Sequence, residues 1–431
     1  MVSIRFEFLN ALVLLGRKKR IALQNVKDDT KMGPKDFLRH CALVTGVVSV
    51  AIALFNLVMD PYLIFGMPRE AGLNARKPAV ESQLFLMKAY DVLRANPRTL
   101  ILGSSSVGIG LDPTSPAWPS EMQPVYNLAV PNGTPLESLR YLQHVTAHDH
   151  PNVVILGLEF RDFLPWSGFK KPEYDSWLLV RSDGSGNEDL IHQHIGDLLL
   201  ATLSLDASVD SLYALSVNLL GDSSDIFQGG WDFRPFRHMT SEVGSYPLFA
   251  LSDFVYAFAS PSLKLDMSPL DDVRSILNIC REERIKLILI LDPGHVDEEE
   301  IFDLAGKWLA LEEWKRELTA LVATYANTDV ATELWDFYGY DAYSTESVPN
   351  SRRALHWFLN PAHYTHPLGD IILRRVLDGS TVPFGVKLTP QNIETRLQEV
   401  RTARTRYRAL QSQDVARVRK LYALATAPRP G

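Results

Sequence analysis

The chain has 431 residues, of which 46% are hydrophobic and 22% charged, so it is long and apolar enough to form a sizeable core. Its net charge of −7 gives no overall attraction to nucleic acid, and we expect no nucleic-acid partner. The sequence has no zinc-type cysteine pairs, no P-loop and no glycine fingerprint that opens a helix. We therefore expect neither a metal ion nor an organic cofactor.

Residues 41–59 contain no charged side chain, and as a helix they would span about 28 Å, close to the thickness of a bilayer core. Basic residues are frequent before this stretch, whereas none follows it until Arg69. The positive-inside rule predicts a cytoplasmic segment over 1–40, a transmembrane helix over 41–59 and an external chain from about residue 60. The alternatives are a buried core helix and a cleaved signal peptide. The lack of a small-x-small cleavage site favours a retained anchor. Met1 and Met32 are both compatible with the start of the protein.

Beyond the anchor, short apolar runs alternate with stretches of helical periodicity. The runs predict strands over 99–104, 125–130, 152–160, 286–292 and 329–337. The periodic stretches predict helices over 134–148, 269–284, about 298–325, and 365–377. Continuous apolar strands separated by helices are typical of a parallel sheet covered on both faces. We predict a three-layer α/β/α domain of flavodoxin-like type over 60–385.

Two further segments interrupt or extend this pattern. Residues from about 165 to 265 are partly helical, and we expect an insertion or cap over the edge of the sheet. Residues 386–431 are predicted to form a basic, helical C-terminal extension. This extension is either a solvated basic surface or a contact with anionic lipid headgroups beside the anchor.

Ligands of open parallel sheets bind beyond the carboxyl ends of the strands, so the residues that follow each strand matter most. The first predicted strand ends in the stretch "GSSS" at 103–106, where a serine would be exposed after a tight glycine turn. The second ends in a turn with Asn132 and Gly133, which could present amide donors to a developing negative charge. The third is followed by the charged stretch "EFRD" at 159–162.

The stretch "HWFLNPAHYTHPLGD" at 356–370 contains three histidines. His363 lies just before a predicted helix and is well placed to act as a general base. A metal site made by the three histidines is disfavoured because no carboxylate or cysteine follows at a suitable spacing.

The order of these four sites resembles the SGNH/GDSL-type hydrolases, over residues about 60 to 380. It is most similar to their membrane-anchored, extracytoplasmic bacterial members, in which "GSS" replaces Gly-Asp-Ser. The resemblance implies an acyl esterase or O-acyltransferase in the bacterial inner (cytoplasmic) membrane, with its main domain in the periplasm. It also implies a membrane-bound protein that acts on an acylated cell-envelope glycan or lipid-linked substrate without a cofactor. It does not identify a protein partner.

The resemblance further implies individual roles. Ser105 falls on the nucleophile and His363 on the base, while the N–H groups of Ser105 and Gly133, with the Asn132 side chain, fall on the oxyanion hole. The family's third block falls on 157–160, where its asparagine is absent. The aspartate that normally supports the histidine is Asn360 in this chain.

Three interpretations of Asn360 remain open at the level of sequence. His363 could use another carboxylate, with Asp336, Glu159 and Asp162 as candidates. Ser105 and His363 could act as a slow dyad. Alternatively, the domain could have lost catalysis and serve as a glycan-binding or scaffolding module of an envelope polysaccharide assembly.

Overall fold

A computed structural model describes residues 33–164, 177–220, 255, 257, 260, 263–326, 329–348 and 355–427. The chain divides into two compact units, Met1–Ala53 and Leu54–Gly431. Helix α2 (Pro34–Met59) begins earlier than the predicted span and has the length and hydropathy of a membrane-crossing helix or of a signal sequence. The expected cytoplasmic segment lies outside the described residues up to position 32.

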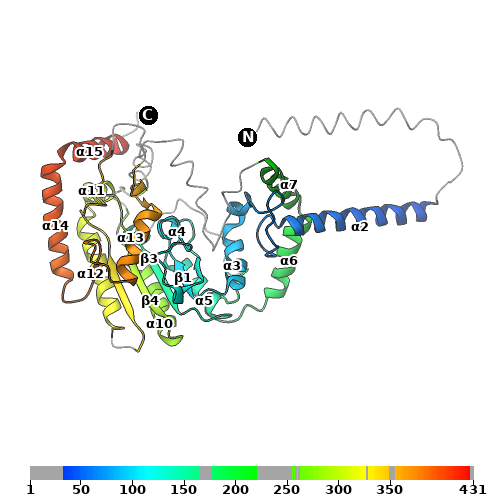
Figure 1. The fold of residues 1–431 in the computed structure, drawn as a ribbon, viewed down its shortest axis with the longest axis horizontal. Helices are drawn as coiled ribbons and strands as arrows, with labels where there is room; N and C mark the ends of the chain where they lie inside the picture. The colour runs from blue at the N-terminus through cyan, green and yellow to red at the C-terminus, as the bar shows by residue number, and fades with distance from the viewer. Residues whose placement is uncertain are drawn as a thin grey trace. The chain divides into compact units, whose positions relative to one another are not determined.

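The second unit is built on a six-stranded sheet with the order β2-β1-β3-β4-β5-β8 (Figure 1). The neighbours from β2 to β5 are parallel, and β8 is antiparallel to β5. The strands are β1 (Thr99–Leu102), β2 (Val125–Asn127), β3 (Val153–Leu158), β4 (Lys286–Leu291), β5 (Thr332–Asp336) and β8 (Val386–Lys387). A separate antiparallel hairpin is formed by β6 (Phe358–Asn360) and β7 (His363–Tyr364).

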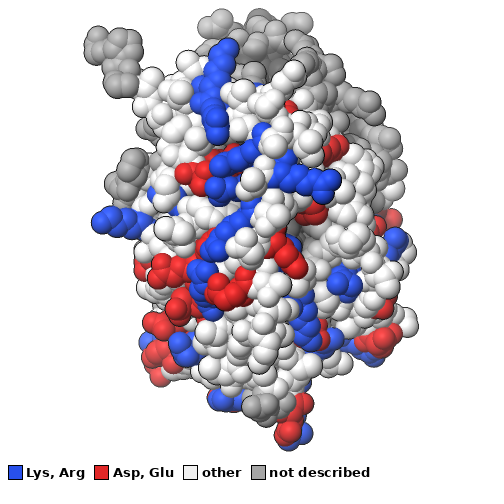
Figure 2. Space-filling model, turned by 90° about the vertical axis from the view of Figure 1, so that its left-hand side faces the viewer, with Lys and Arg blue, Asp and Glu red and all other residues white. Residues whose placement is uncertain are grey.

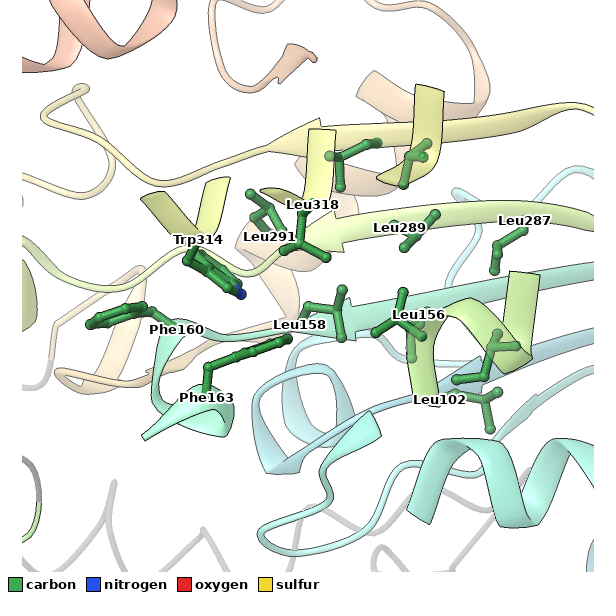
Figure 3. Close-up of a cluster of buried hydrophobic side chains, with 14 of the residues drawn as sticks. Leu102, Leu156, Leu158, Phe160, Phe163, Leu287, Leu289, Leu291, Trp314 and Leu318 are labelled. Atoms are coloured by element: carbon green, nitrogen blue, oxygen red, sulfur yellow. The ribbon is translucent and has the colours of Figure 1, made fainter. Parts of the chain in front are cut away.

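Both faces of the central strands β1, β3 and β4 are buried, and nearly every residue in these three strands is apolar. Alternate side chains along the strands enter two different clusters, and Figure 3 shows the leucines of one face packed with Phe160, Phe163 and Trp314. The helices that contribute to that cluster include α3 (Leu84–Ala95), α5 (Pro135–Thr146), α10 (Pro269–Glu282) and α12 (Trp308–Ala323). The helices of the other cluster are α4 (Ser105–Gly110) and α13 (His366–Leu377). Short 3₁₀ turns complete the framework: η2 (Val80–Gln83), η3 (Ser120–Met122) and η4 (Phe160–Phe163).

The predicted strands and most predicted helices are present with small shifts at their ends. The helix predicted over 298–325 is wrong as a single element. It consists of α11 (Val296–Leu304) and α12, separated at Gly306, whose φ of +71° a helix does not allow.

The segment predicted to cap the sheet edge contains α6 (Leu190–Leu203) and α7 (Leu205–Leu220). Their buried alanines pack instead with Tyr62 and Ile64, which follow α2 in the sequence, and with Leu86 of α3. Leu178 and Val255 of the same segment pack with the leucines of the sheet, so α6 and α7 depart from the predicted cap whereas these two residues do not. Residues 165–176 and 221–254 of the same segment lie outside the described part of the chain.

The basic extension forms α14 (Ile393–Leu410) and α15 (Ser412–Thr426). Five of its arginines pair with acidic residues of the domain, mostly on α11 and α12. The pairs are Arg396–Asp336, Arg401–Glu312, Arg404–Asp303, Arg408–Glu300 and Arg417–Asp297. Figure 2 shows blue and red side chains interleaved on this side of the molecule. The extension is therefore part of the folded domain, where these five arginines have acidic partners, and its contact with lipid headgroups stays a prediction.

Candidate functional site

The turns after β1, β2 and β3 meet at one edge of the sheet. Gly103 has a φ of +136°, and a Cβ at this position would lie 2.8 Å from the carbonyl oxygen of Gly157. A Cβ on Gly133 would overlap the carbonyl oxygen of Gly103. The three backbones therefore approach closely only because these positions are glycines.

The structure assigns different roles to the three serines after β1. Ser104 is buried, caps α4 by accepting from the N–H of Ser106, and donates to Glu159 Oε2 at 2.9 Å. Ser106 is buried and donates to the carbonyl oxygen of Ala362 at 2.7 Å. Ser105 is partly exposed, and its Oγ lies 2.7 Å from Nε2 of His363. Only Ser105, among these three, combines solvent access with a basic partner.

The contacts of Asn360 define which nitrogen of His363 carries the proton. Asn360 Oδ1 accepts from the N–H groups of Ala362 and His363, both at 3.0 Å, which identifies this atom as the oxygen. It also lies 2.8 Å from His363 Nδ1, so that Nδ1 must donate. Nε2 is then the unprotonated nitrogen, and the Ser105 hydroxyl donates to it. This is the arrangement that a general base requires.

The hairpin β6–β7 and the packing of α13 against α4 place His363 beside Ser105. The hairpin β6–β7 pairs Asn360 with His363, and α13 follows directly. In α13, a Cβ on Gly369 would overlap the carbonyl oxygen of Gly110 at the end of α4. Asn127 of β2 is buried and donates to the carbonyl oxygens of Val107 and Gly108 in α4, both at 3.3 Å, and of Leu111 just after it, at 2.9 Å. The short helix that carries Ser105 is thus held between β2 and α13.

A buried charge network lies behind the serine loop. Arg161 pairs with Glu159, contacts Glu298 at 3.4 Å and donates to Ser106 Oγ at 2.9 Å. The side chains of Glu159 and Glu298 are 4% and 3% exposed, so this is an internal ion cluster and not a solvated surface group. Through Ser104 and Ser106, it contacts the residues on both sides of Ser105.

Burial and the nearby Arg161 charge lower the pKa of His363 from 6.5 to about 3, so the imidazole is neutral near pH 7. Burial raises the pKa of Glu298 to about 8 against the opposing effect of Arg161. Burial also raises the pKa of Asp292, whose Oδ1 accepts from the Tyr364 hydroxyl at 3.1 Å. A neutral histidine and two carboxyls with raised pKa values therefore lie near the buried Arg161–Glu159 ion pair.

The structure gives the alternative carboxylates other partners than His363. Asp336 is held by Lys315 and Arg396, at 2.8 and 2.9 Å. Glu159 faces Ser104 and Arg161, and Asp162 accepts from the N–H of Glu159 at 2.9 Å. Since Asn360 occupies the position at Nδ1, the expectation that another carboxylate supports His363 is wrong.

The three expected oxyanion donors differ in whether another group in the structure already accepts their hydrogen bond. The N–H of Gly133 donates to the carbonyl oxygen of Val130 at 2.9 Å, so this donor is already used within the turn, and its assignment is wrong for this conformation. Asn132 is exposed in the same turn, with a φ of +52°. The N–H of Ser105 belongs to the first turn of α4, where amides have no acceptor within the helix.

Sequence reasoning missed the supporting residues Asn127, Asp292, Glu298 and Gly369. The available signals were polar residues within or just after apolar strands, an acidic run at 297–300, and a glycine inside a predicted helix. Each such residue is costly unless it has a partner or a packing role.

No family model matches the chain, and no curated protein is significantly similar to it in sequence. Within the described ranges, no group of three or more histidine, cysteine or acidic side chains is placed to hold a metal ion.

Proposed function

We propose that the protein is a membrane-anchored serine acyl esterase or O-acyltransferase of SGNH type, with Ser105 as nucleophile and His363 as general base. The observation that carries the proposal is the 2.7 Å contact between Ser105 Oγ and His363 Nε2, in a ring oriented by Asn360. The strand order β2-β1-β3-β4-β5 supports the doubly wound, three-layer fold expected of this family. The site lies beside β1, where the strand order reverses and such folds bind ligands.

In the proposed reaction, Ser105 Oγ attacks the carbonyl carbon of an acyl ester while His363 Nε2 accepts the hydroxyl proton. The tetrahedral intermediate collapses, and the same proton passes to the leaving alcohol. Water or a sugar hydroxyl then attacks the acyl-serine, gives its proton to Nε2, and releases Ser105 when the proton returns to Oγ. The N–H of Ser105 and the side-chain amide of Asn132 are the proposed donors to the oxyanion.

Asn360 orients the imidazole but brings no negative charge to the imidazolium that forms in the transition state. The same aspartate-to-asparagine change in a serine protease costs about 10⁴-fold in turnover, a value that belongs to that enzyme and includes the loss of the correct histidine tautomer. We therefore expect a slow enzyme, suited to a substrate that is held at high local concentration.

Membrane anchoring supports such a substrate. The basic residues before α2 and their scarcity after it support a cytoplasmic N-terminus and an external domain in the bacterial inner membrane. An acylated envelope glycan or lipid-linked intermediate would meet the site there. Asn360 also favours one alternative, a catalytically impaired domain that binds such a glycan in the same place.

Labelling of the full chain with a fluorescent fluorophosphonate tests the proposal. We expect label on the wild type and on the matched control Ser120→Ala, which changes an exposed serine outside the site. We expect none on Ser105→Ala, and at least about a hundredfold slower labelling of His363→Ala. Absence of label on folded wild type, or label that persists in Ser105→Ala, would overturn the enzyme and favour the binding module.

A further inference from the structure

Helix α6 has its polarity inverted relative to a helix on a water-facing surface. Its buried positions include Asp197 and Ala201, which are 4% and 1% exposed. Its large apolar side chains are those left uncovered: Ile191, Ile195, Leu198, Leu199, Leu200 and Leu203. Amphipathic helices of soluble domains show the opposite arrangement.

Helix α7 repeats this inversion. Its buried residues are small or polar and recur at helical spacing: Ala207, Ser211, Ala214 and Asn218. Its exposed residues include Leu205, Val209, Leu212, Tyr213, Leu219 and Leu220. The sequence has no lysine or arginine between Arg181 and Arg234. Small and polar residues inside with large apolar residues outside is the pattern of helices that face lipid.

The pair is fixed to the carboxyl end of α2. Asn56, in the last turn of α2, donates to the carbonyl oxygen of Thr202 at 2.8 Å and to Ser208 Oγ at 3.0 Å. These two residues flank the bend between the helices, which is 52°. The Tyr62 hydroxyl, just after α2, donates to Asp210 at 2.8 Å. The pair of helices is therefore attached to the last turn of the apolar helix α2 and to the residues just after it.

Two buried polar side chains of the pair, Asp197 and Asn218, bond to residues between positions 76 and 90. Asp197 accepts from the Tyr90 hydroxyl at 2.6 Å, and Asn218 exchanges hydrogen bonds with the backbone of Arg76. These contacts satisfy side chains that hydrocarbon would otherwise make costly.

We propose that α6 and α7 form a second membrane contact, a bent helix pair that lies in the lipid leaflet beside the carboxyl end of α2. The partner is the bilayer itself. The bend and the exposed Asp206 beside it indicate that the pair enters the leaflet without crossing it. The proposal does not depend on the chemistry at Ser105.

Fluorescence quenching on the full chain tests this contact. The protein is reconstituted in vesicles of phosphatidylcholine and phosphatidylglycerol, with or without bromine on the phosphatidylcholine acyl chains. A bimane probe is attached to Leu199→Cys or Leu212→Cys in a Cys41→Ser background. Cys280 is buried, and burial raises the pKa of its thiol to about 12, so it should not react.

Two matched positions calibrate the signal. The native Cys41, exposed on α2, reports a lipid-facing helix, and Leu309→Cys reports an exposed leucine on α12, which is 75% exposed. We expect brominated lipid to quench probes at 199 and 212 about as strongly as the probe at Cys41, and severalfold more than the probe at 309. Iodide in water should quench only the probe at 309.

Other outcomes overturn the proposal. Quenching of 199 and 212 by iodide but not by brominated lipid means that the surface faces water. Protection from both quenchers means that protein covers it, either a second copy or another segment of this chain. The Cys41 probe reports separately on the anchor, so a failure of anchoring is distinguishable from a failure of the helix pair.

Discussion

At the scale of single residues, Asn360 sets the strength of the proposed base. Its Oδ1 fixes His363 by a 2.8 Å hydrogen bond, but a neutral amide leaves the pKa of the ring low, at about 3. A low pKa keeps the ring unprotonated over a wide pH range, and it also makes Nε2 a weak acceptor for the serine proton.

Asn360→Asp should therefore strengthen the base. A carboxylate at Nδ1 stabilises the imidazolium, so we expect fluorophosphonate labelling at pH 7 to rise by at least about tenfold. In the wild type, the labelling rate should stay flat as the pH falls to about 4, because protonation of His363 begins only near its pKa of about 3. In Asn360→Asp, the acid limb of the pH profile, where labelling slows as His363 is protonated, should move up toward the usual histidine pKa of about 6.5. An unchanged rate with an unchanged acid limb would contradict this role for Asn360.

Arg161 is a positioning residue, since it contacts Ser106 and Glu159 but not the reacting atoms. Its charge also lowers the pKa of His363. Arg161→Lys keeps the charge, so we expect slower labelling with the acid limb unmoved. Arg161→Gln removes the charge, so the acid limb should rise. Arg161→Gln should also lose about 3–5 kcal/mol of stability because buried carboxylates lose their partner.

A merely structural role would predict a different result for Arg161. Both variants would then lose labelling in proportion to their loss of stability in urea melts, and neither would shift the acid limb. The pH profile therefore separates positioning and electrostatics from folding.

At the scale of elements, the contact between α4 and α13 brings serine and histidine together. Gly369 lies inside α13, where alanine has the higher helix propensity by up to about 1 kcal/mol. The structure predicts the opposite sign, because a Cβ there overlaps the backbone of Gly110. We expect Gly369→Ala to lose about 1–3 kcal/mol in urea unfolding and at least about tenfold in labelling rate.

Gly108→Ala is the matched control, since this glycine is also helical and its Cβ would meet only Ala129, at 3.6 Å. The Gly108→Ala variant should leave the free energy of unfolding unchanged or raise it slightly. Equal losses in the two variants would mean that the approach of α13 to α4 does not control the site.

The elements also show what the sequence could predict. Strands such as β3 and β4 were predictable because six successive apolar residues between helical stretches favour a buried parallel strand. The break at Gly306 was missed because the apolar periodicity continues on both sides of it. The packing of α6 and α7 was missed because a hydrophobic pattern does not say whether its large or its small residues face inward.

The residues of the candidate site were predictable from the sequence, but most of the contacts between them were not. Strand ends and the resemblance to a known family identified Ser105, His363 and Asn360, and the structure places His363 in contact with each of the other two. The partners of Glu159, Asp162 and Asp336 were not predictable, because ion pairs such as Asp336 with Arg396 join residues 60 positions apart. The donor role of Gly133 failed because hydrogen bonding within a turn depends on its conformation.

At the scale of the whole molecule, buried ionisable groups make stability depend on pH. Burial raises the pKa of Glu298 and Glu299 to about 8, and lowers that of His144 and His363 to about 4 and about 3. A raised carboxyl pKa means that the folded state holds protons that the unfolded state releases above about pH 4.5, so stability falls as pH rises toward 8. The lowered pKa values of the two histidines have the opposite effect, because they reduce stability as the pH falls, but only below about pH 6.5.

Between pH 6.5 and 8, the carboxyl effect therefore acts without the histidine effect. Each buried glutamate should contribute a loss on the order of 1–2 kcal/mol over this window. We expect the melting temperature of the full chain in detergent to fall from pH 6.5 to 8, although most globular proteins change little there.

Glu299→Gln isolates one of these groups, since it keeps the shape of the side chain and removes its titration. Glu299 is 1% exposed and lies away from the contacts of Ser105. The variant should match the wild type near pH 5 and show a shallower fall in melting temperature from pH 6.5 to 8. Glu282→Gln, at an exposed position on α10, should follow the wild-type curve. Parallel curves for all three proteins would mean that Glu299 is ionised in the folded state, held by the nearby Lys315, whose charge lowers its pKa.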